Sequence, residues 1–164
     1  MQHVTVLCVG KLKESYWRDA VAEYAKKEGA SQKAVSDFKN IPGLFDSLQL
    51  LFTRYDKIKS DWQEGKRLLS RIPRDALTVA LCIEGKTVSS EMLSARLSSW
   101  ALDGKSHIVF VIGGSFGLSD EVKNAAALRL SMSPMTFPHQ LARVMLLEQI
   151  YRAFQIASGG KYHK

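Results

Sequence analysis

The chain has 164 residues, the size of one ordinary domain, and 46% of them are apolar, which is enough to bury a core. Its 23 Lys and Arg against 16 Asp and Glu give a net charge of +7, which favours a polyanionic partner but also fits a solvated basic surface. No apolar run reaches the roughly 18 residues that a membrane span needs, and the first residues lack the pattern of a signal peptide. We therefore expect a single domain over residues 1–164, located in the cytoplasm and without a membrane partner.

Strand-like apolar runs alternate with segments of helical periodicity along the chain. The expected elements are strands at 3–9, 77–83 and 108–112, each followed by a helix, at 14–27, 89–100 and 119–129 respectively. The strand at 77–83 is expected to close at Glu84–Lys86, and a further helix is expected at 62–69. This alternation predicts an α/β fold with a mainly parallel sheet flanked by helices.

Two regions depart from the strand–helix alternation. Residues 29–63 show no clear order, and 44–52 fits either a helix or a strand. Near the carboxyl end, two prolines mark a loop at 133–139, and a helix follows at 141–157. That helix is apolar nearly all round, more than one core face requires, so we expect a subunit interface and a homodimer.

The glycine-rich segment after the strand at 108–112 is a candidate ligand site. Gly113, Gly114 and Gly117 allow a ligand to approach the backbone at the carboxyl edge of a parallel sheet. Their spacing matches neither the dinucleotide fingerprint nor the phosphate-binding P-loop. A ligand site and a tight structural turn therefore both stay open on this pattern alone.

The cysteines and histidines do not indicate a metal site. Cys8 and Cys82 lie inside apolar strand-like runs, where a thiol behaves as a small buried hydrophobe. The four histidines show no ligand spacing. We therefore expect no metal.

Several segments together resemble one family. They are Val9–Lys13, Gly85–Glu91, Phe110–Leu118, Met135–Gln140, Glu148–Ala153 and Tyr162–Lys164. These segments look like the ribosomal RNA large subunit methyltransferase H family, small members of the trefoil-knotted SPOUT methyltransferases. The resemblance covers residues 1–28 and 64–164, whereas 29–63 lacks the strand and acidic segment usual in the family.

The resemblance implies a fold, a cofactor and a reaction. It implies an α/β fold with a carboxyl-terminal trefoil knot, a homodimer, and S-adenosylmethionine as methyl donor. The implied reaction is methylation at N3 of a pseudouridine in large-subunit (23S) ribosomal RNA, so the expected partner is that RNA or the ribosome, and not DNA. Transferred by position, the cofactor-binding residues are Leu81, Gly113, Met132, Ser133, Pro134, Met135, Thr136 and Phe137.

The candidate catalytic residues are His139, Arg143, Tyr162 and His163. His139 follows the cofactor loop and can orient or deprotonate the base, although a first-turn histidine bonded to backbone fits as well. Arg143 and the tail offer donors and an aromatic ring for phosphate and base contacts. Because the family shares the tail signature, we expect the tail to fold back onto an active site, its own or that of the partner subunit. Glu148 and Arg152 have the spacing of an ordinary helical ion pair.

Two other functional classes compete with this interpretation. One is a non-catalytic RNA-binding or ribosome-associated protein that retains the knotted fold, and cofactor binding distinguishes it from an enzyme. The other is a nucleotide-dependent oxidoreductase, which requires Gly-x-Gly-x-x-Gly after the first strand. The first strand here is followed only by Gly10 and Lys11, so the oxidoreductase ranks far below.

Overall fold

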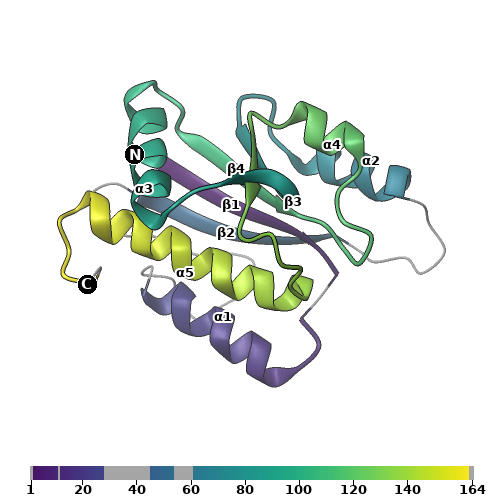
Figure 1. The fold of residues 1–164 in the computed structure, drawn as a ribbon, viewed down its shortest axis with the longest axis horizontal. Coiled ribbons are helices and arrows are strands. Elements are labelled where there is room, and N and C mark those ends of the chain that lie inside the picture. The colour runs from purple at the N-terminus through teal and green to yellow at the C-terminus, as the bar shows by residue number, and fades with distance from the viewer. Residues whose placement is uncertain (1, 11, 28–44, 54–60, 163–164) are drawn as a thin grey trace.

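The computed structural model describes residues 2–10, 12–27, 45–53 and 61–162. Strands and helices alternate along this part of the chain (Figure 1). In order they are β1 (Gln2–Val9), α1 (Ser15–Lys27), β2 (Phe45–Thr53), α2 (Asp61–Arg71), β3 (Leu77–Thr87), α3 (Ser90–Leu102), β4 (His107–Ile112), α4 (Asp120–Ala125), β5 (Leu128–Ser131) and α5 (His139–Ala157). None of the described helices is both long and apolar enough to cross a membrane.

The strands form one parallel sheet in the order β2-β1-β4-β3-β5. This confirms the predicted α/β class. Parallel neighbours place the carboxyl ends of all strands at the same edge of the sheet, where open α/β folds bind their ligands. That edge is therefore the first place to look for a site.

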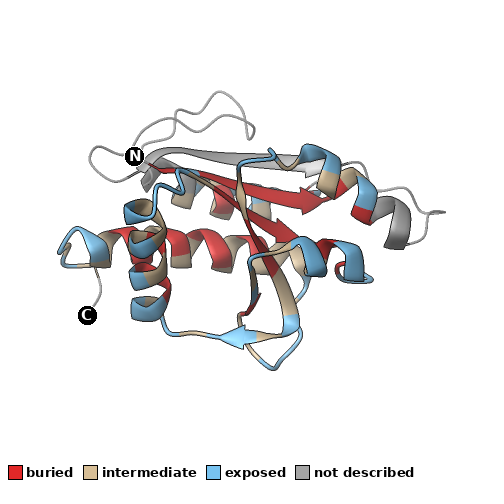
Figure 2. Ribbon diagram, turned by 90° about the horizontal axis from the view of Figure 1, so that it is seen from above, coloured by how far each residue is buried: buried red, intermediate tan, exposed pale blue. Residues whose placement is uncertain are grey.

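Helices cover both faces of the sheet, because side chains of each strand alternate between the faces. In β1, Val4, Val6 and Cys8 belong to a core cluster with α1, α3 and α5, whereas Leu7 and Val9 belong to a second cluster with α2 and α4. Figure 1 shows α1, α3 and α5 together on one side, and Figure 2 shows the buried strand centre between the layers. The sequence prediction of apolar runs buried on both faces is thus confirmed.

Three of the expected boundaries need correction. Within the segment at 44–52, open between helix and strand, the described residues belong to β2 (Phe45–Thr53), which pairs with β1 and supplies the sheet edge that seemed to be missing. The helix expected to reach Arg129 ends at Ala125, because the backbone becomes extended at Ala126 and Ala127 N–H donates to the carbonyl of Thr78 at 2.9 Å. Hydrogen bonding to a strand about fifty residues earlier thus overrides local helix propensity.

The third correction concerns the end of β3, which continues to Thr87 instead of closing at Glu84. Leu130 of β5 is the partner of both Leu81 and Lys86, so β3 contains an irregularity and then meets β5 again. Gly85 lies in this irregularity. A Cβ added there would be 2.7–2.8 Å from backbone atoms of residues 129–131, so a side chain would separate the strands.

We expect Gly85→Ala to lower the free energy of unfolding by about 1–3 kcal/mol, because the new methyl group overlaps rigid backbone rather than a flexible side chain. Chemical denaturation measures the change. Ser99→Ala, at an exposed position on α3, is the matched control and should stay within about 0.5 kcal/mol. Equal stability of Gly85→Ala and the unchanged protein would contradict the close strand contact.

Candidate active site at the carboxyl edge of the sheet

A cavity of about 720 Å³ lies at the carboxyl ends of β3, β4 and β5. Three chain segments form its wall: the irregular part of β3, the glycine loop after β4, and the loop between β5 and α5. Lys123 of α4 and the first turn of α5 complete it. Residues distant in the sequence meet here because their strands are parallel and end together.

The glycine loop is a tight turn with little room for side chains. Gly117 N–H donates to the carbonyl of Gly114 at 3.0 Å, and Gly117 has a φ of +78°, which favours glycine. A Cβ on Gly113 would lie 2.3 Å from the Gly117 carbonyl oxygen. The loop is therefore a tight turn, as one interpretation of its glycines expected, and it also borders the cavity, while ligand binding there stays a prediction.

Side chain–backbone hydrogen bonds shape the loop between β5 and α5. The hydroxyl of Ser131 donates to the carbonyl of Ser133 at 3.0 Å, and the hydroxyl of Ser133 accepts from Met135 N–H at 3.0 Å. These bonds stabilise a non-helical conformation of the loop. The loop then enters α5 at Pro138, whose fixed φ suits a helix start.

Most of the predicted cofactor-binding residues come together around this cavity. Those in its lining are Leu81, Gly113, Met132, Ser133, Met135, Thr136 and Phe137. Pro134 belongs to the same loop but is not among the lining residues. The seven lining residues are spread over all three segments of the cavity wall.

The predicted catalytic residues, in contrast, are divided. His139 lines the cavity at the start of α5. Its pKa is lowered, first by burial and then by the positive charge of Arg143, so the imidazole is neutral at pH 7. A neutral imidazole can accept a proton from a ligand in the cavity.

Arg143 is fully buried and is not among the lining residues. Its guanidinium donates to the carbonyl of Val9, at the end of β1. Burial lowers the pKa of Arg143, but the nearby carbonyl oxygen stabilises the charged form. In this position the side chain attaches the start of α5 to the sheet.

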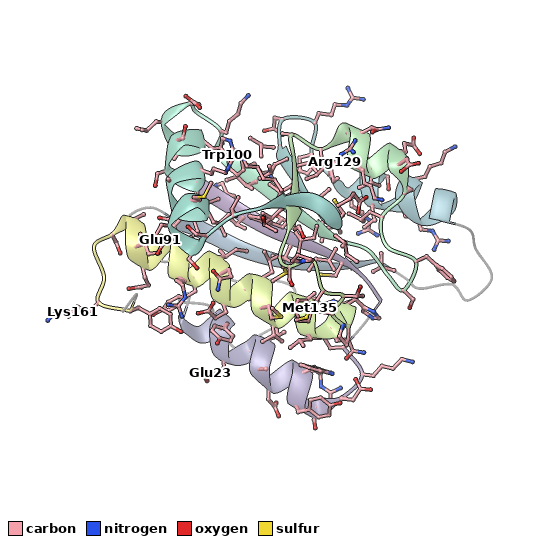
Figure 3. All side chains as sticks on the ribbon, in the orientation of Figure 1. Glu23, Glu91, Trp100, Arg129, Met135 and Lys161 are labelled. Carbon is pink, nitrogen blue, oxygen red and sulfur yellow. The ribbon has the colours of Figure 1, made fainter. Side chains whose placement is uncertain are left out.

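Tyr162 lies against the second half of α5, away from the cavity. Figure 3 shows this separation, with Met135 near the cavity end of the helix and Lys161 beyond the other end. The ring of Tyr162 packs edge-on against Tyr151, with centroids 4.8 Å apart, and the Arg152 guanidinium is 4.8 Å from its centre. Its hydroxyl donates to Glu148 at 3.5 Å. His163, the remaining predicted residue, lies outside the described residues.

The ion pair predicted for Glu148 and Arg152 is confirmed, with a nitrogen–oxygen distance of 2.6 Å. Gln149 donates to the same carboxylate, and Ser90 donates to Gln149, both at 2.6 Å. The pair thus belongs to a hydrogen-bonded chain between α3, α5 and the tail. Through the Tyr162 hydroxyl, this chain holds the tail against α5.

Sequence analysis missed several residues of the cavity wall. Lys123 and Glu84 form an ion pair of 2.5 Å on it, which raises the pKa of Lys123 and lowers that of Glu84. Cys82, expected to be a buried core thiol, is only partly buried and also lines the cavity. Phe116 is exposed on the glycine loop. For Cys82, Glu84 and Phe116, the usable signal was their position near the carboxyl end of a strand, the edge at which open α/β folds bind ligands.

Comparison with known proteins gives the family of the chain. The family model described as "Predicted SPOUT methyltransferase" matches residues 2–163. A relative from Bifidobacterium animalis subsp. lactis, named "Ribosomal RNA large subunit methyltransferase H", is 46% identical and covers 99% of both chains. A relative of the same name from Bifidobacterium adolescentis is 47% identical over 98% of this chain and 99% of its own.

A solved structure shows the same fold at low sequence identity. It is a probable methylase family protein from Haemophilus influenzae Rd KW20, with a TM-score of 0.55 and 13% identity, matched over 98% of this chain and 70% of that one. The match of the family model along nearly the whole chain includes residues 29–63, which had seemed divergent. The chain belongs to the SPOUT methyltransferase family.

Proposed function

We propose that this chain transfers a methyl group from S-adenosylmethionine to N3 of a pseudouridine in large-subunit ribosomal RNA, acting in the cytoplasm as a homodimer. One observation carries the proposal: the residues that resemble the family's cofactor site surround a single cavity at the carboxyl edge of the sheet. The two relatives, which share nearly half of their residues with this chain, carry names that specify ribosomal RNA.

The cavity fits the proposed cofactor in size and chemistry. Its volume of about 720 Å³ falls within the roughly 300–1,000 Å³ typical of small-molecule sites. Leu81, Leu130 and Phe137 provide an apolar wall for an adenine ring, and the non-helical loop offers backbone donors and acceptors. When bound, S-adenosylmethionine supplies a methyl group attached to a positively charged sulfur.

The charge of the chain supports an RNA substrate. The net charge is +7. Lys123, which is paired with Glu84, lies on the cavity wall, and Arg129 of β5 lies next to it. Arg129 is exposed, and its Nε donates to the carbonyl of Lys123 at 3.1 Å. Such groups attract phosphates and position RNA without reading its sequence.

His139 is proposed to orient the target base and accept the N3 proton. It lines the cavity, and its lowered pKa leaves the imidazole neutral at pH 7. The base and the methyl donor must be in line for transfer, so placement of the base contributes much of the rate. Arg143 acts in this scheme by holding the start of α5, and with it His139.

The position of the tail supports a dimer with shared sites. Tyr162 contacts Glu148, Tyr151 and Arg152, which lie about 14–20 Å along α5 from His139, and it is not among the residues that line the cavity of its own subunit. The tail therefore reaches an active site most directly across a subunit interface. Met145, Tyr151 and Ile156 of α5 stay partly exposed, which leaves apolar surface for a second subunit.

The central test is methyl transfer to ribosomal particles from cells that lack this protein. Mass-spectrometric mapping should find one added methyl group, on a pseudouridine of the large-subunit RNA. Calorimetry should detect binding of S-adenosylmethionine and of its demethylated product, but not of NAD.

Gly113→Val should weaken cofactor binding by about tenfold, or 1.4 kcal/mol, because the new side chain displaces the glycine loop.

Gly104→Val is the matched control for Gly113→Val. Gly104 also follows a regular element, but no atom lies within 4 Å of an added Cβ and the residue does not line the cavity. Its φ of +74° strains a valine, so the substitution should affect fold stability and not the cavity. Cofactor affinity should therefore stay unchanged in this variant. Folded protein that binds neither methionine compound would end the cofactor proposal.

The pH dependence of the rate tests the role of His139. Because burial lowers its pKa below 6.5, the fraction of neutral imidazole rises as the pH increases through the acid range. We expect kcat/KM for RNA to rise with pH below about 6.5 and then level off. His139→Gln should lose this acid limb together with about 10²- to 10⁴-fold in rate. An acid limb that persists in His139→Gln would exclude His139 as the base.

Mixing two inactive variants tests whether the tail serves the partner. One variant carries His139→Ala, and the other lacks residues 162–164. A mixed dimer contains one site with both an intact His139 and an intact partner tail, so mixing should restore activity. If each tail serves its own subunit, both sites of the mixed dimer are defective and the mixture stays inactive.

A further inference from the structure

Exposed apolar side chains gather at the mouth of the cavity. Of the six large hydrophobic residues that are exposed in the described part of the chain, three line it: Phe116 at 74%, Met135 at 67% and Ile83 at 52%. They come from three different wall segments. Single exposed apolar residues are common on protein surfaces, whereas several of them gathered at one opening indicate a binding surface.

Phe116 is the aromatic member of this group, and its backbone is held firmly. The Gly114–Gly117 turn closes around it through a hydrogen bond of 3.0 Å and the close contact of Gly113 with Gly117. Ser115 and Gly117, its neighbours, carry little side-chain bulk. The ring is therefore presented by a rigid turn, which lowers the entropy lost when a flat partner packs on it.

The groups beside Phe116 favour a nucleic acid over a protein partner. The same cavity contains Lys123, which is paired with Glu84, and the exposed Arg129 adds a second cation next to Lys123. Cations beside an exposed aromatic ring are the combination that binds phosphate and base together. A subunit contact would instead be expected to exclude charged groups from its centre.

The proposed reaction itself requires a stacking partner. An enzyme that modifies a base takes it out of the RNA stack and must replace some of the stacking energy that is lost. Phe116, Phe137 and His139 are the aromatic side chains among the described lining residues, and Phe116 is the exposed one. We infer that Phe116 is the stacking platform for an RNA base at the mouth of the cofactor cavity. This inference rests on the proposed RNA methylation.

Four variants at this position test the inference: Phe116→Ala, Phe116→Leu, Phe116→Tyr and Phe116→Trp. The readouts are kcat and KM for ribosomal particles, cofactor affinity by calorimetry, and mass by light scattering. Phe116→Ala should reduce kcat/KM for RNA by about 5- to 100-fold, the usual effect of removing one stacked aromatic. Tyr and Trp should keep activity, Leu should fall close to Ala, and cofactor affinity should stay within twofold throughout.

The tryptophan variant also gives a direct signal. The emission of Phe116→Trp minus that of the unchanged protein should decrease when RNA is added, because a stacked base quenches indole fluorescence. Leu102→Ala is the control: Leu102 is 89% exposed at the end of α3 and is not among the lining residues. It should leave methylation unchanged.

Each contrary outcome is distinct. Full RNA activity in Phe116→Ala overturns the inference, and so does activity of Phe116→Leu equal to that of Phe116→Tyr, which would indicate apolar contact without stacking. A fall in mass on substitution would assign Phe116 to the subunit interface instead. If the unchanged protein methylates no RNA, the proposed function fails first, and the stacking role fails with it.

Discussion

The parallel pairing of β3, β4 and β5 is the constraint on which the cavity depends. Parallel strands end at one edge, so the loops that follow them converge although their residues are far apart in the chain. The close approach of β3 to β5 at Gly85 is the tightest part of this arrangement. A side chain there would move β5 and, with it, the loop of residues 132–137. Fold stability and the shape of the cavity are thus coupled through backbone contacts.

The placement of α5 is the second determinant, and buried polar contacts at both ends add to its apolar packing in the core. Arg143 attaches the start of the helix to the Val9 carbonyl, and Ser94 donates to the carbonyl of Ala153 at 2.6 Å near its other end. Burying a guanidinium is costly unless it is hydrogen-bonded, so this contact specifies one position for the helix. His139 lines the cavity as a result. The Arg143 side chain is fully buried in the single subunit, where RNA does not reach it. A direct contact between Arg143 and RNA therefore stays a prediction.

The length of α5 separates two groups of residues that the family resemblance assigns to one reaction. His139 begins the helix at the cavity, whereas Tyr162 packs on Tyr151 and Arg152 in the second half of the helix. Within one rigid subunit these groups stay apart. The proposed dimer resolves the separation, because a second subunit can bring a tail to the cavity. The hydrogen-bonded chain from Ser90 through Gln149 to Glu148 ends at the Tyr162 hydroxyl and so holds the tail of each subunit against its own α5.

The sequence by itself determined the α/β class, most element positions and the proline-bearing loop at 133–139, because apolar periodicity, caps and prolines are local features. It did not determine the strand at 45–53, the end of α4 at Ala125 or the extension of β3 to Thr87. Those depend on backbone hydrogen bonds between distant residues, as between Ala127 and Thr78. Only the tertiary structure placed Phe116 and Lys123 on one cavity and Tyr162 away from it. The reason is geometric: strand order and helix length decide which residues meet, and neither is written in local sequence.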